Sequence, residues 1–387
     1  MAACCRWPAS DDRDAQIRAL AGEGMDWPQL LAVARRQRVR GLVRDSLAQA
    51  GILPPPVVAE TLERASRAIA VKNLNVLAES VRLEALFRAR AIPVIFLKGL
   101  ALARVAYGSI SSKHGRDVDL LVPEDRALDA WSLLEAEGYG LWRIRRELGP
   151  SRRRALVRYS AEVELIHQDH GLPLDLHWRL TQNPALFDAS GLWSRIQEVE
   201  IEDGQRLPTL GDADLFAYLC VHGGLHAWAR MKWLADLNAF VATRSADEIE
   251  ALYRKAEALG SGVCAGQGLL LCRLLFQLEL PGGLERRLLA SGRVRRLARI
   301  ALQVMIGQNA ATERAELKSF GVDRYLTYLS LLLLGDSLAF YGAQLKMISI
   351  GGDDVMALPL PEALHFLYPL VRLPLWMGRI IRKSLKG

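Results

Sequence analysis

The stretch FLKGLALARVAYGSISSKHGRDVDLLV, residues 96–122, decides the fold because a helical pattern lies in it between two strand patterns. The apolar run AIPVIFLKG, residues 91–99, suits a central strand that ends in a glycine turn. Residues 100–108, LALARVAYG, have helical spacing, and residues 116–123, RDVDLLVP, form a second strand pattern that proline stops. This order of strand, helix and strand predicts a small sheet with helices packed on it.

More strand patterns follow on the C-terminal side. A helix with acidic residues in its first turn is expected over residues 123–139. Three further strands are predicted at LWRIRREL (141–148), AEVELIHQ (161–168) and LPLDLHWRL (172–180), the last two joined by the turn-forming QDHG, and QEVEIEDGQRLPTL (197–210) suits a hairpin at the margin of the sheet.

Helical periodicity dominates both ends of the chain. The predicted fold class is therefore α+β, a small mixed sheet flanked by N-terminal helices and by a large C-terminal helical region. We expect a helical region over residues 1–90, a catalytic domain over 91–210 and a helical domain over 211–387.

Composition places the protein among ordinary globular chains. It has 387 residues, of which 51% are hydrophobic and 24% charged, enough for a large buried core. The five cysteines lack CxxC spacing, which argues against a disulfide framework and against a structural zinc site. The N-terminus does not have the pattern of a signal peptide, and a cytoplasmic location is expected.

Two apolar stretches invite a membrane interpretation. Asp336 interrupts residues 329–340, while Glu362, Arg372 and several prolines interrupt residues 358–377. Charges at these places argue against a transmembrane segment and favour buried helices. The basic end GRIIRKSLKG leaves peripheral membrane contact open.

The formal net charge of +7 is unevenly distributed. One short stretch contains a cluster of arginines at positions 143, 145, 146, 152, 153, 154 and 158. Such a cluster attracts phosphates, but a solvated loop or edge strand explains it slightly better. Neither aromatic interleaving nor a helix-turn-helix pattern accompanies it, so sequence-specific nucleic-acid recognition is not expected.

Acidic residues are placed on the predicted strands with a spacing of two. Asp117 and Asp119 should project on one face, and Asp175 shares a face with His177 on a later strand. Carboxylates brought together repel each other unless a divalent cation lies between them, and oxygen ligands suit Mg²⁺ or Mn²⁺. The three aspartates are therefore the predicted metal ligands and catalytic residues.

Paired ions of this kind support nucleotidyl transfer. Two ions about 3.5–4 Å apart can hold the attacking and leaving oxygens of a phosphoryl displacement. One would gather a nucleoside triphosphate (NTP) and the other would activate an acceptor hydroxyl, with Asp175 as shared ligand or proton acceptor.

The phosphates of such a substrate need a cradle. Gly99 allows a sharp turn, and the helix that starts near Leu100 would aim its free N–H groups at an anion. Lys98 or Arg116 could add a positive charge. A glycine turn or a pair of spaced aspartates is by itself weak evidence, and only the ordered set carries the argument.

The motifs LKGLALARVAYG, GRDVDLLV and LPLDLHW resemble the bacterial uncharacterised nucleotidyltransferase family of the polymerase-beta-like superfamily. The resemblance implies that Gly99 is the phosphate-side glycine, that Asp117 and Asp119 are the metal-binding pair, and that Asp175 is the third carboxylate. Leu100 stands where the superfamily commonly has Gly or Ser. The resemblance further implies a natural-product or peptide acceptor.

The helical region supplies further candidates. His222 and His226 are four residues apart, but they lack the other ligands of a zinc site, and a structural role is favoured. Lys232 and Asp236 have the spacing of a helix ion pair. Because superfamily members often complete the nucleotide pocket from a helical domain, the resemblance implies a phosphate role for Lys232, with Asp236 orienting it.

The leading hypothesis is a metal-dependent nucleotidyltransferase that moves a nucleoside monophosphate (NMP) from an NTP to a hydroxyl or phosphate on a small molecule or peptide. Two alternatives stay open. One is a tailoring enzyme on the same scaffold that transfers another phosphate-linked group. The other is a non-catalytic module that binds a peptide or a membrane.

Overall fold

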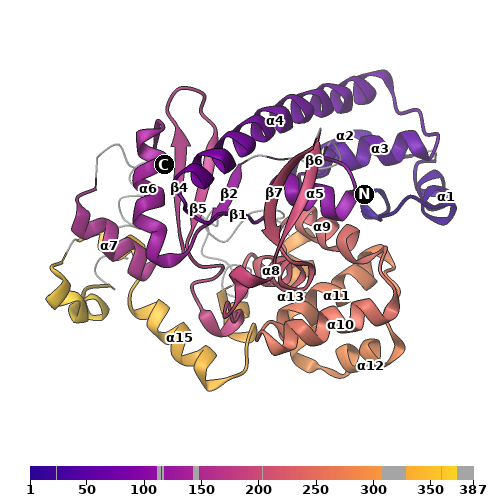
Figure 1. The fold of residues 1–387 in the computed structure, drawn as a ribbon. Helices are drawn as coiled ribbons and strands as arrows, with labels where there is room; N and C mark the ends of the chain where they lie inside the picture. The colour runs from indigo at the N-terminus through magenta and orange to yellow at the C-terminus, as the bar shows by residue number, and fades with distance from the viewer. Residues whose placement is uncertain are drawn as a thin grey trace. The chain divides into compact units, whose positions relative to one another are not determined.

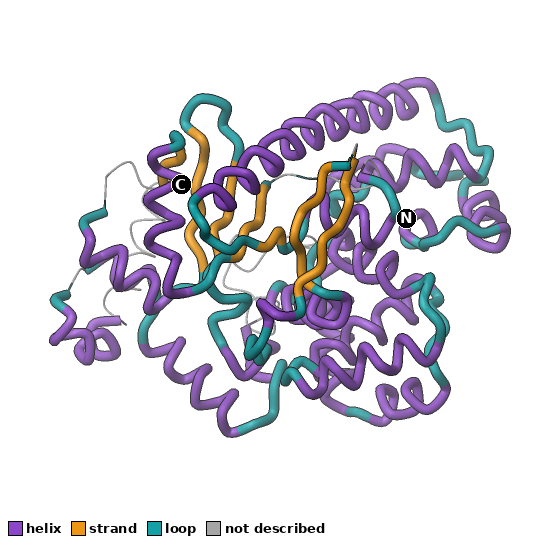
Figure 2. Tube along the Cα trace, viewed as in Figure 1, coloured by secondary structure: helices purple, strands orange, loops and turns teal. Residues whose placement is uncertain are grey.

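The structure is a computed structural model, and it describes residues 1–22, 24–110, 115, 117–142, 148–202, 204–306, 328–358 and 360–372. The chain divides into two compact units. Figure 1 labels their helices and strands, and Figure 2 colours the same trace by secondary structure. The first unit consists of Met1–Glu84, Ile95–Val118 and Leu186–Gly335, and the second of Ala85–Val94, Asp119–Ala185 and Asp336–Gly387.

The first unit opens with helices. They are α1 (Asp11–Leu20), α2 (Trp27–Arg36), α3 (Arg40–Gln49) and the long α4 (Pro56–Ala89), whose last residues belong to the second unit. Ser10 and Asp26 cap α1 and α2 by accepting hydrogen bonds from backbone N–H groups of their first turns. These caps explain where the predicted helical section is cut into separate helices.

Residues 95–107 then contribute β1 (Ile95–Phe96) and α5 (Gly99–Tyr107) to the first unit. A hairpin of β6 (Ile196–Glu202) and β7 (Gln205–Leu210) lies against them, and the hydroxyl of Thr209 donates to the carbonyl of Phe96 at 2.7 Å. The predicted hairpin is present, but its expected place at the margin of the sheet is wrong, because β6 and β7 form a separate two-stranded sheet that contacts β1.

Six helices complete the first unit as far as the structure describes it through residue 306. They are α8 (Asp212–Leu225), α9 (Met231–Val241), α10 (Ala246–Ala258), α11 (Gly262–Phe276), α12 (Gly282–Ala290) and α13 (Gly292–Ile306). Helix α11 is largely buried, and α8, α9, α10 and α13 pack on it (Figure 1). A Cβ atom on Gly268 would come within 2.7 Å of Leu237 and 3.1 Å of Trp228, so this glycine permits the close helix approach.

The second unit contains most of the sheet. One sheet has the strand order β1-β2-β5-β4-β3, with β2 at Val118–Leu121, β3 at Tyr139–Leu141, β4 at Glu162–His167 and β5 at Pro173–His177. Strands β4 and β5 pair antiparallel, and their register places Glu162 opposite His177 and Glu164 opposite Asp175. The turn over residues 168–171 joins them as predicted, with Gly171 at φ +64°. The α+β fold class with a small mixed sheet is confirmed.

Helices of the second unit include one that the sequence analysis missed. They are α6 (Ala127–Ala136), α7 (Pro150–Tyr159), α15 (Leu338–Ser349) and α16 (Gly352–Ala357). Helix α7 carries Arg152, Arg153, Arg154 and Arg158, so the interpretation of this part of the cluster as a loop or edge strand is wrong. Pro150 in the first turn and the buried pair Ala155 and Leu156 favour the helix.

Short 3-10 helices lie at Ala3–Cys5, Glu124–Arg126, Pro184–Leu186, Leu192–Ser194, Leu331–Leu333 and Glu362–Leu367.

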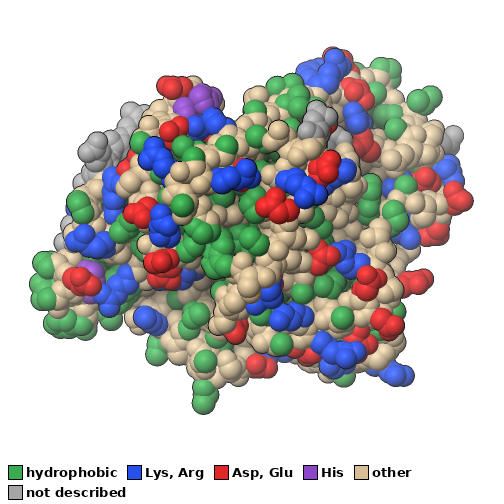
Figure 3. All heavy atoms as spheres, viewed as in Figure 1, with side chains coloured by type: hydrophobic (Ala, Val, Ile, Leu, Met, Phe, Trp, Pro, Cys, Tyr) green, Lys and Arg blue, Asp and Glu red, His purple; other side chains and the backbone are tan. Residues whose placement is uncertain are grey.

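Within the described ranges, the chain has no helix with the length and apolar character needed to span a bilayer. Figure 3 shows basic and acidic side chains interspersed over the face in view. The expected regions 1–90, 91–210 and 211–387 stay a prediction.

Candidate active site

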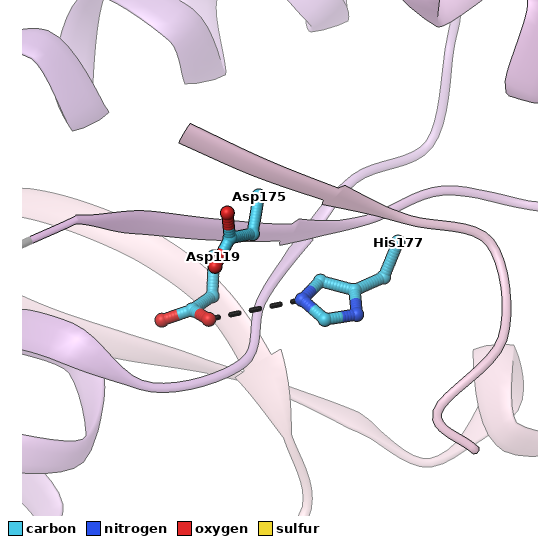
Figure 4. Close-up of side chains that lie close together, drawn as sticks. All are labelled: Asp119, Asp175 and His177. Atoms are coloured by element: carbon cyan, nitrogen blue, oxygen red, sulfur yellow. Dashed lines mark ion pairs between the residues drawn. The ribbon is translucent and has the colours of Figure 1, made fainter. Parts of the chain in front are cut away.

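Strands β2 and β5 bring two aspartates and a histidine together. Asp119, Asp175 and His177 each offer a ligand atom, and these atoms lie within 4.8 Å of one another (Figure 4). Side chains on β5 alternate between the two faces of the strand. The fully buried Leu174 and Leu176 therefore lie on the face opposite to Asp175 and His177. The alternation predicted from the sequence puts Asp175 and His177 on one face, and the neighbouring position of β2 and β5 brings them to Asp119.

His177 is held between two acids. Its Nδ1 lies 2.7 Å from an oxygen of Glu162, and its Nε2 lies 3.7 Å from an oxygen of Asp119. The first distance is a hydrogen bond and the second is longer than one. Because the Glu162 carboxylate accepts the proton of Nδ1, we assign the tautomer in which Nε2 presents its lone pair towards Asp119.

The donor set of this group fits a divalent cation. Asp119 and His177 are only 6% and 5% exposed, whereas Asp175 is half-buried. Carboxylate oxygens and an imidazole nitrogen are ligands of Mn²⁺, Zn²⁺ and related ions, and carboxylates are also ligands of Mg²⁺. Bringing the buried Asp119 carboxylate close to that of Asp175 is unfavourable without a neutralising cation, so the arrangement suits a metal site.

Asp117 lies just before β2 and is half-buried. Among the residues that the structure describes, the metal-ligand group does not include it. Gly99 approaches its backbone, since a Cβ on this glycine would lie 3.8 Å from the carbonyl oxygen of Asp117. Gly99 has φ +62°, a backbone conformation that glycine adopts without strain.

The segment before Asp117 is fastened by a residue that the sequence analysis did not single out. The side chain of Asn73 accepts a hydrogen bond from the N–H of Gly115 at 2.8 Å and donates to the carbonyl of Ile110 at 2.9 Å. Asn73 is only 2% exposed, on a long helix whose sequence pattern shows nothing unusual there. Asn73 therefore hydrogen-bonds to the backbone at two points, Ile110 and Gly115, of the segment that leads into β2.

The predicted phosphate residues lie at the start of α5. Lys98 is the N-cap residue, and its ammonium lies 6.0 Å from the ring centre of Tyr218. Gly99 is the first residue of the helix. Arg116 lies outside the described residues.

Lys232 and Asp236 lie at the other end of α5. They line a pocket of about 160 Å³ that also includes Tyr107, the last residue of that helix. The hydroxyl of Tyr107 donates to Asp236 at 3.0 Å. Since nine helical residues span about 13 Å, the structure separates this pair from Lys98 and Gly99.

The pocket around Lys232 is rich in cations. Its lining includes Arg38, Arg44, Arg67 and Lys232, against the carboxylates Asp45 and Asp236. Burial, and then the neighbouring Asp236 carboxylate, raise the pKa of Tyr107 well above its ordinary value, so the phenol keeps its proton. Arg44 pairs with Asp45 and Glu63, and the lining still contains more cations than carboxylates, which favours an anionic ligand.

The arginine cluster divides into two parts. Arg143, Arg145 and Arg146 lie outside the described residues. On α7, Arg153 pairs with Glu135 at 2.5 Å, and Arg158 pairs with Glu362 at 2.7 Å. These ion pairs favour a structural role for those two residues over phosphate binding.

His222 and His226 pack together with Trp233 at the end of α8. Their ring centres are 4.6 Å apart, and both lie within 5.4 Å of the Trp233 ring centre. In the described part of the chain, the metal-ligand group is confined to the sheet. The structural interpretation of these histidines therefore remains the simpler one.

Several of the site's contacts were not predictable from the aspartate spacing. Glu162 reaches His177 through the β4–β5 register, and its signal is the period of two in EVELIH. Tyr107 reaches Asp236 across a helix contact that no local pattern reveals.

Comparison with known proteins gives the family. A family model described as an uncharacterised nucleotidyltransferase matches residues 23–277, more than half of the chain and including the acid and histidine group. The search of curated proteins returned no match. The resemblance stated from the motifs is confirmed. The chain belongs to the uncharacterised nucleotidyltransferase family and is an enzyme that transfers phosphorus-containing groups.

Proposed function

We propose that this protein transfers an NMP group from an NTP to a hydroxyl or phosphate on a small molecule or peptide, and that pyrophosphate leaves. The observation that carries the proposal is the meeting of Asp119, Asp175 and His177 within 4.8 Å. Family membership gives this group its chemical context.

The acids are proposed to hold the catalytic cation. Asp119 and Asp175 supply carboxylate oxygens, and Asp117 remains a predicted further ligand from the segment before β2. A bound divalent ion, Mg²⁺ or Mn²⁺, would offset part of the negative charge of the triphosphate and lower the pKa of the acceptor hydroxyl. Asp175 is more exposed than Asp119, which suits a second role as acceptor of the hydroxyl proton.

Lys98, Gly99 and Arg116 are proposed to bind the triphosphate. Gly99 is the first residue of α5 and adds no side chain there, and the first N–H groups of a helix lack intrahelical partners. They can donate to phosphate oxygens, and the helix dipole favours negative charge at the same end. Lys98 adds a charge beside them.

Lys232 and Asp236 are proposed to complete nucleotide binding from the helical region. The surplus of cations in their pocket supports an anionic partner. Asp236 accepts from Tyr107 and lies one turn after Lys232, so it can orient the ammonium.

A natural-product or peptide acceptor follows only from the resemblance, and it stays a proposal. A reducing, cytoplasmic compartment is likewise proposed. Its support is that the five cysteines are all free and buried.

The test is incubation of the full chain with each of the four common NTPs, with Mg²⁺ or Mn²⁺, and with candidate acceptors. We expect metal-dependent pyrophosphate release with one NTP and an acceptor whose mass increases by one NMP. Asp119→Asn should abolish both signals. A mass gain other than NMP would favour the alternative tailoring reaction, and the absence of both turnover and NTP binding would favour a non-catalytic module.

A further inference from the structure

We propose that His177 is a direct nitrogen ligand of the divalent ion, that Glu162 positions it, and that the site therefore prefers Mn²⁺ or a similar transition-metal ion to Mg²⁺. The inference deepens the proposed function and rests on it for the presence of a catalytic ion. It assigns roles that the aspartate spacing did not provide.

Distances support His177 as a ligand. Two atoms bound to one ion at about 2.1 Å each lie between about 3 and 4.2 Å apart, depending on the coordination angle. The 3.7 Å between Nε2 of His177 and the Asp119 oxygen falls in this range and exceeds a hydrogen bond. Figure 4 shows the imidazole and the Asp119 carboxylate pointing towards each other, with Asp175 beside them.

Glu162 fixes the tautomer and the ring orientation in which His177 can bind an ion. Metal-binding histidines commonly donate their second ring N–H to a carboxylate, which sets the tautomer and the ring orientation. Glu162 makes this contact at 2.7 Å, and the strand register places the two residues opposite each other. The buried ring is thereby held with Nε2 towards the acids.

An imidazole ligand changes which ion the site prefers. Mg²⁺ binds oxygen ligands and keeps several waters, whereas imidazole suits transition-metal divalents. Replacing one oxygen donor by nitrogen therefore weakens Mg²⁺ relative to Mn²⁺. The simpler alternative is that His177 only forms an ion pair with Asp119 and that the ion binds oxygens alone.

Pulsed electron paramagnetic resonance of Mn²⁺ bound to the full chain separates these accounts. The wild type should show ¹⁴N coupling from a directly bound imidazole, and His177→Ala should lose it. His170→Ala is the matched control, since His170 is exposed in the turn between β4 and β5. Its variant should keep the coupling.

Metal affinity tests the positioning residue. Glu162→Gln should weaken Mn²⁺ binding about 10-fold or more and keep the nitrogen coupling. Glu164→Gln removes the same charge from the same strand, but at the position opposite Asp175. If both variants weaken binding equally, Glu162 acts only through its charge, and its positioning role is wrong.

Calorimetry completes the test. Wild-type protein should bind Mn²⁺ at least about 10-fold more tightly than Mg²⁺, and His177→Ala should narrow that ratio. Absence of Mn²⁺ binding, bound Mn²⁺ without nitrogen coupling, coupling that survives His177→Ala, or equal Mn²⁺ and Mg²⁺ affinity would overturn the inference. Nitrogen coupling in a protein that shows no NTP turnover would instead uphold the inference and refute the proposed function.

Discussion

Two aspartates in different units are almost equally buried but have different partners. Asp119 is 6% exposed and lies close to the ligand atoms of Asp175 and His177. Asp236 is 5% exposed and accepts a hydrogen bond from the Tyr107 phenol. Burial alone therefore does not distinguish a carboxylate of the proposed metal site from a carboxylate that is hydrogen-bonded to a phenol.

The difference lies in what each neighbourhood offers to a ligand. The groups near Asp119 are the Asp175 carboxylate and a ring nitrogen of His177, which can donate electron pairs to a metal ion. A bound cation would therefore stabilise this group of side chains most. At Asp236 a neutral donor satisfies the carboxylate, and cations line the adjoining pocket. The first region is suited to a metal ion and the second to an anion.

The largest expected effect is on catalysis at the first aspartate. Asp119→Asn should lower kcat about 10³-fold or more, because the ion contributes several kcal/mol of charge stabilisation. Its unfolding temperature without metal should stay within about 2 °C of wild type or rise, because one member of an acidic group becomes neutral. Steady-state kinetics and thermal unfolding measure these effects.

The control for this substitution is Asp169→Asn, on the exposed turn between β4 and β5. It should keep wild-type turnover. Full activity of Asp119→Asn would show that Asp119 does not hold a catalytic ion, and the proposed difference from Asp236 would be wrong.

Removal of the donor to the second aspartate should instead affect stability. Tyr107→Phe leaves Asp236 without the 3.0 Å phenol hydrogen bond and should lower the free energy of unfolding by about 1–3 kcal/mol. Urea denaturation measures the change, and Tyr341→Phe, at a partly exposed position on α15, serves as the control. An unchanged midpoint would mean that the contact contributes nothing to stability.

A smaller effect is expected on nucleotide affinity. Lys232→Ala should raise the KM for the NTP about 3- to 10-fold and leave kcat nearly unchanged, since it removes binding energy shared by ground state and transition state. Lys346→Ala, an exposed position on α15, is the control. A fall in kcat without a change in KM would place Lys232 at the chemical step.

The smallest expected effect is on how the stability of the fold depends on pH. The pKa of Tyr107 is raised on folding, so the unfolded chain releases this proton first as the pH rises above about 10. Stability from this group is complete below that pH and declines above it. Wild type should therefore lose stability more steeply than Tyr107→Phe between pH 9 and 11, about the ordinary phenol pKa. Parallel slopes would contradict the assignment.

Local sequence patterns predicted much of the fold and part of the site. The period of two in β5 put Asp175 and His177 on one face, because side-chain direction in a strand depends only on local alternation. That β5 lies beside β2 and so brings these residues to Asp119 is a matter of strand order, which local spacing does not give. The turn before β5 and the β6–β7 hairpin followed from their polar and glycine residues.

Long-range contacts were beyond those patterns. The pairing of Glu162 with His177 depends on strand register, and the clamp by Asn73 depends on where a long helix lies. Helix α7 was missed because its sequence contains many arginines and only a short apolar face around Leu156, so its helical periodicity is weak. For Glu162 and Asn73 the deciding interaction joins residues that local spacing does not relate, whereas for α7 the local pattern itself was misleading.

The most direct measurement of the central account is Mn²⁺ binding to wild-type protein and to Asp175→Asn by calorimetry. The account predicts stoichiometric binding to the wild type and at least about 10-fold weaker binding to the variant, since a carboxylate ligand is lost. Equal affinity in the two proteins would show that the aspartates of β2 and β5 do not share a metal ion.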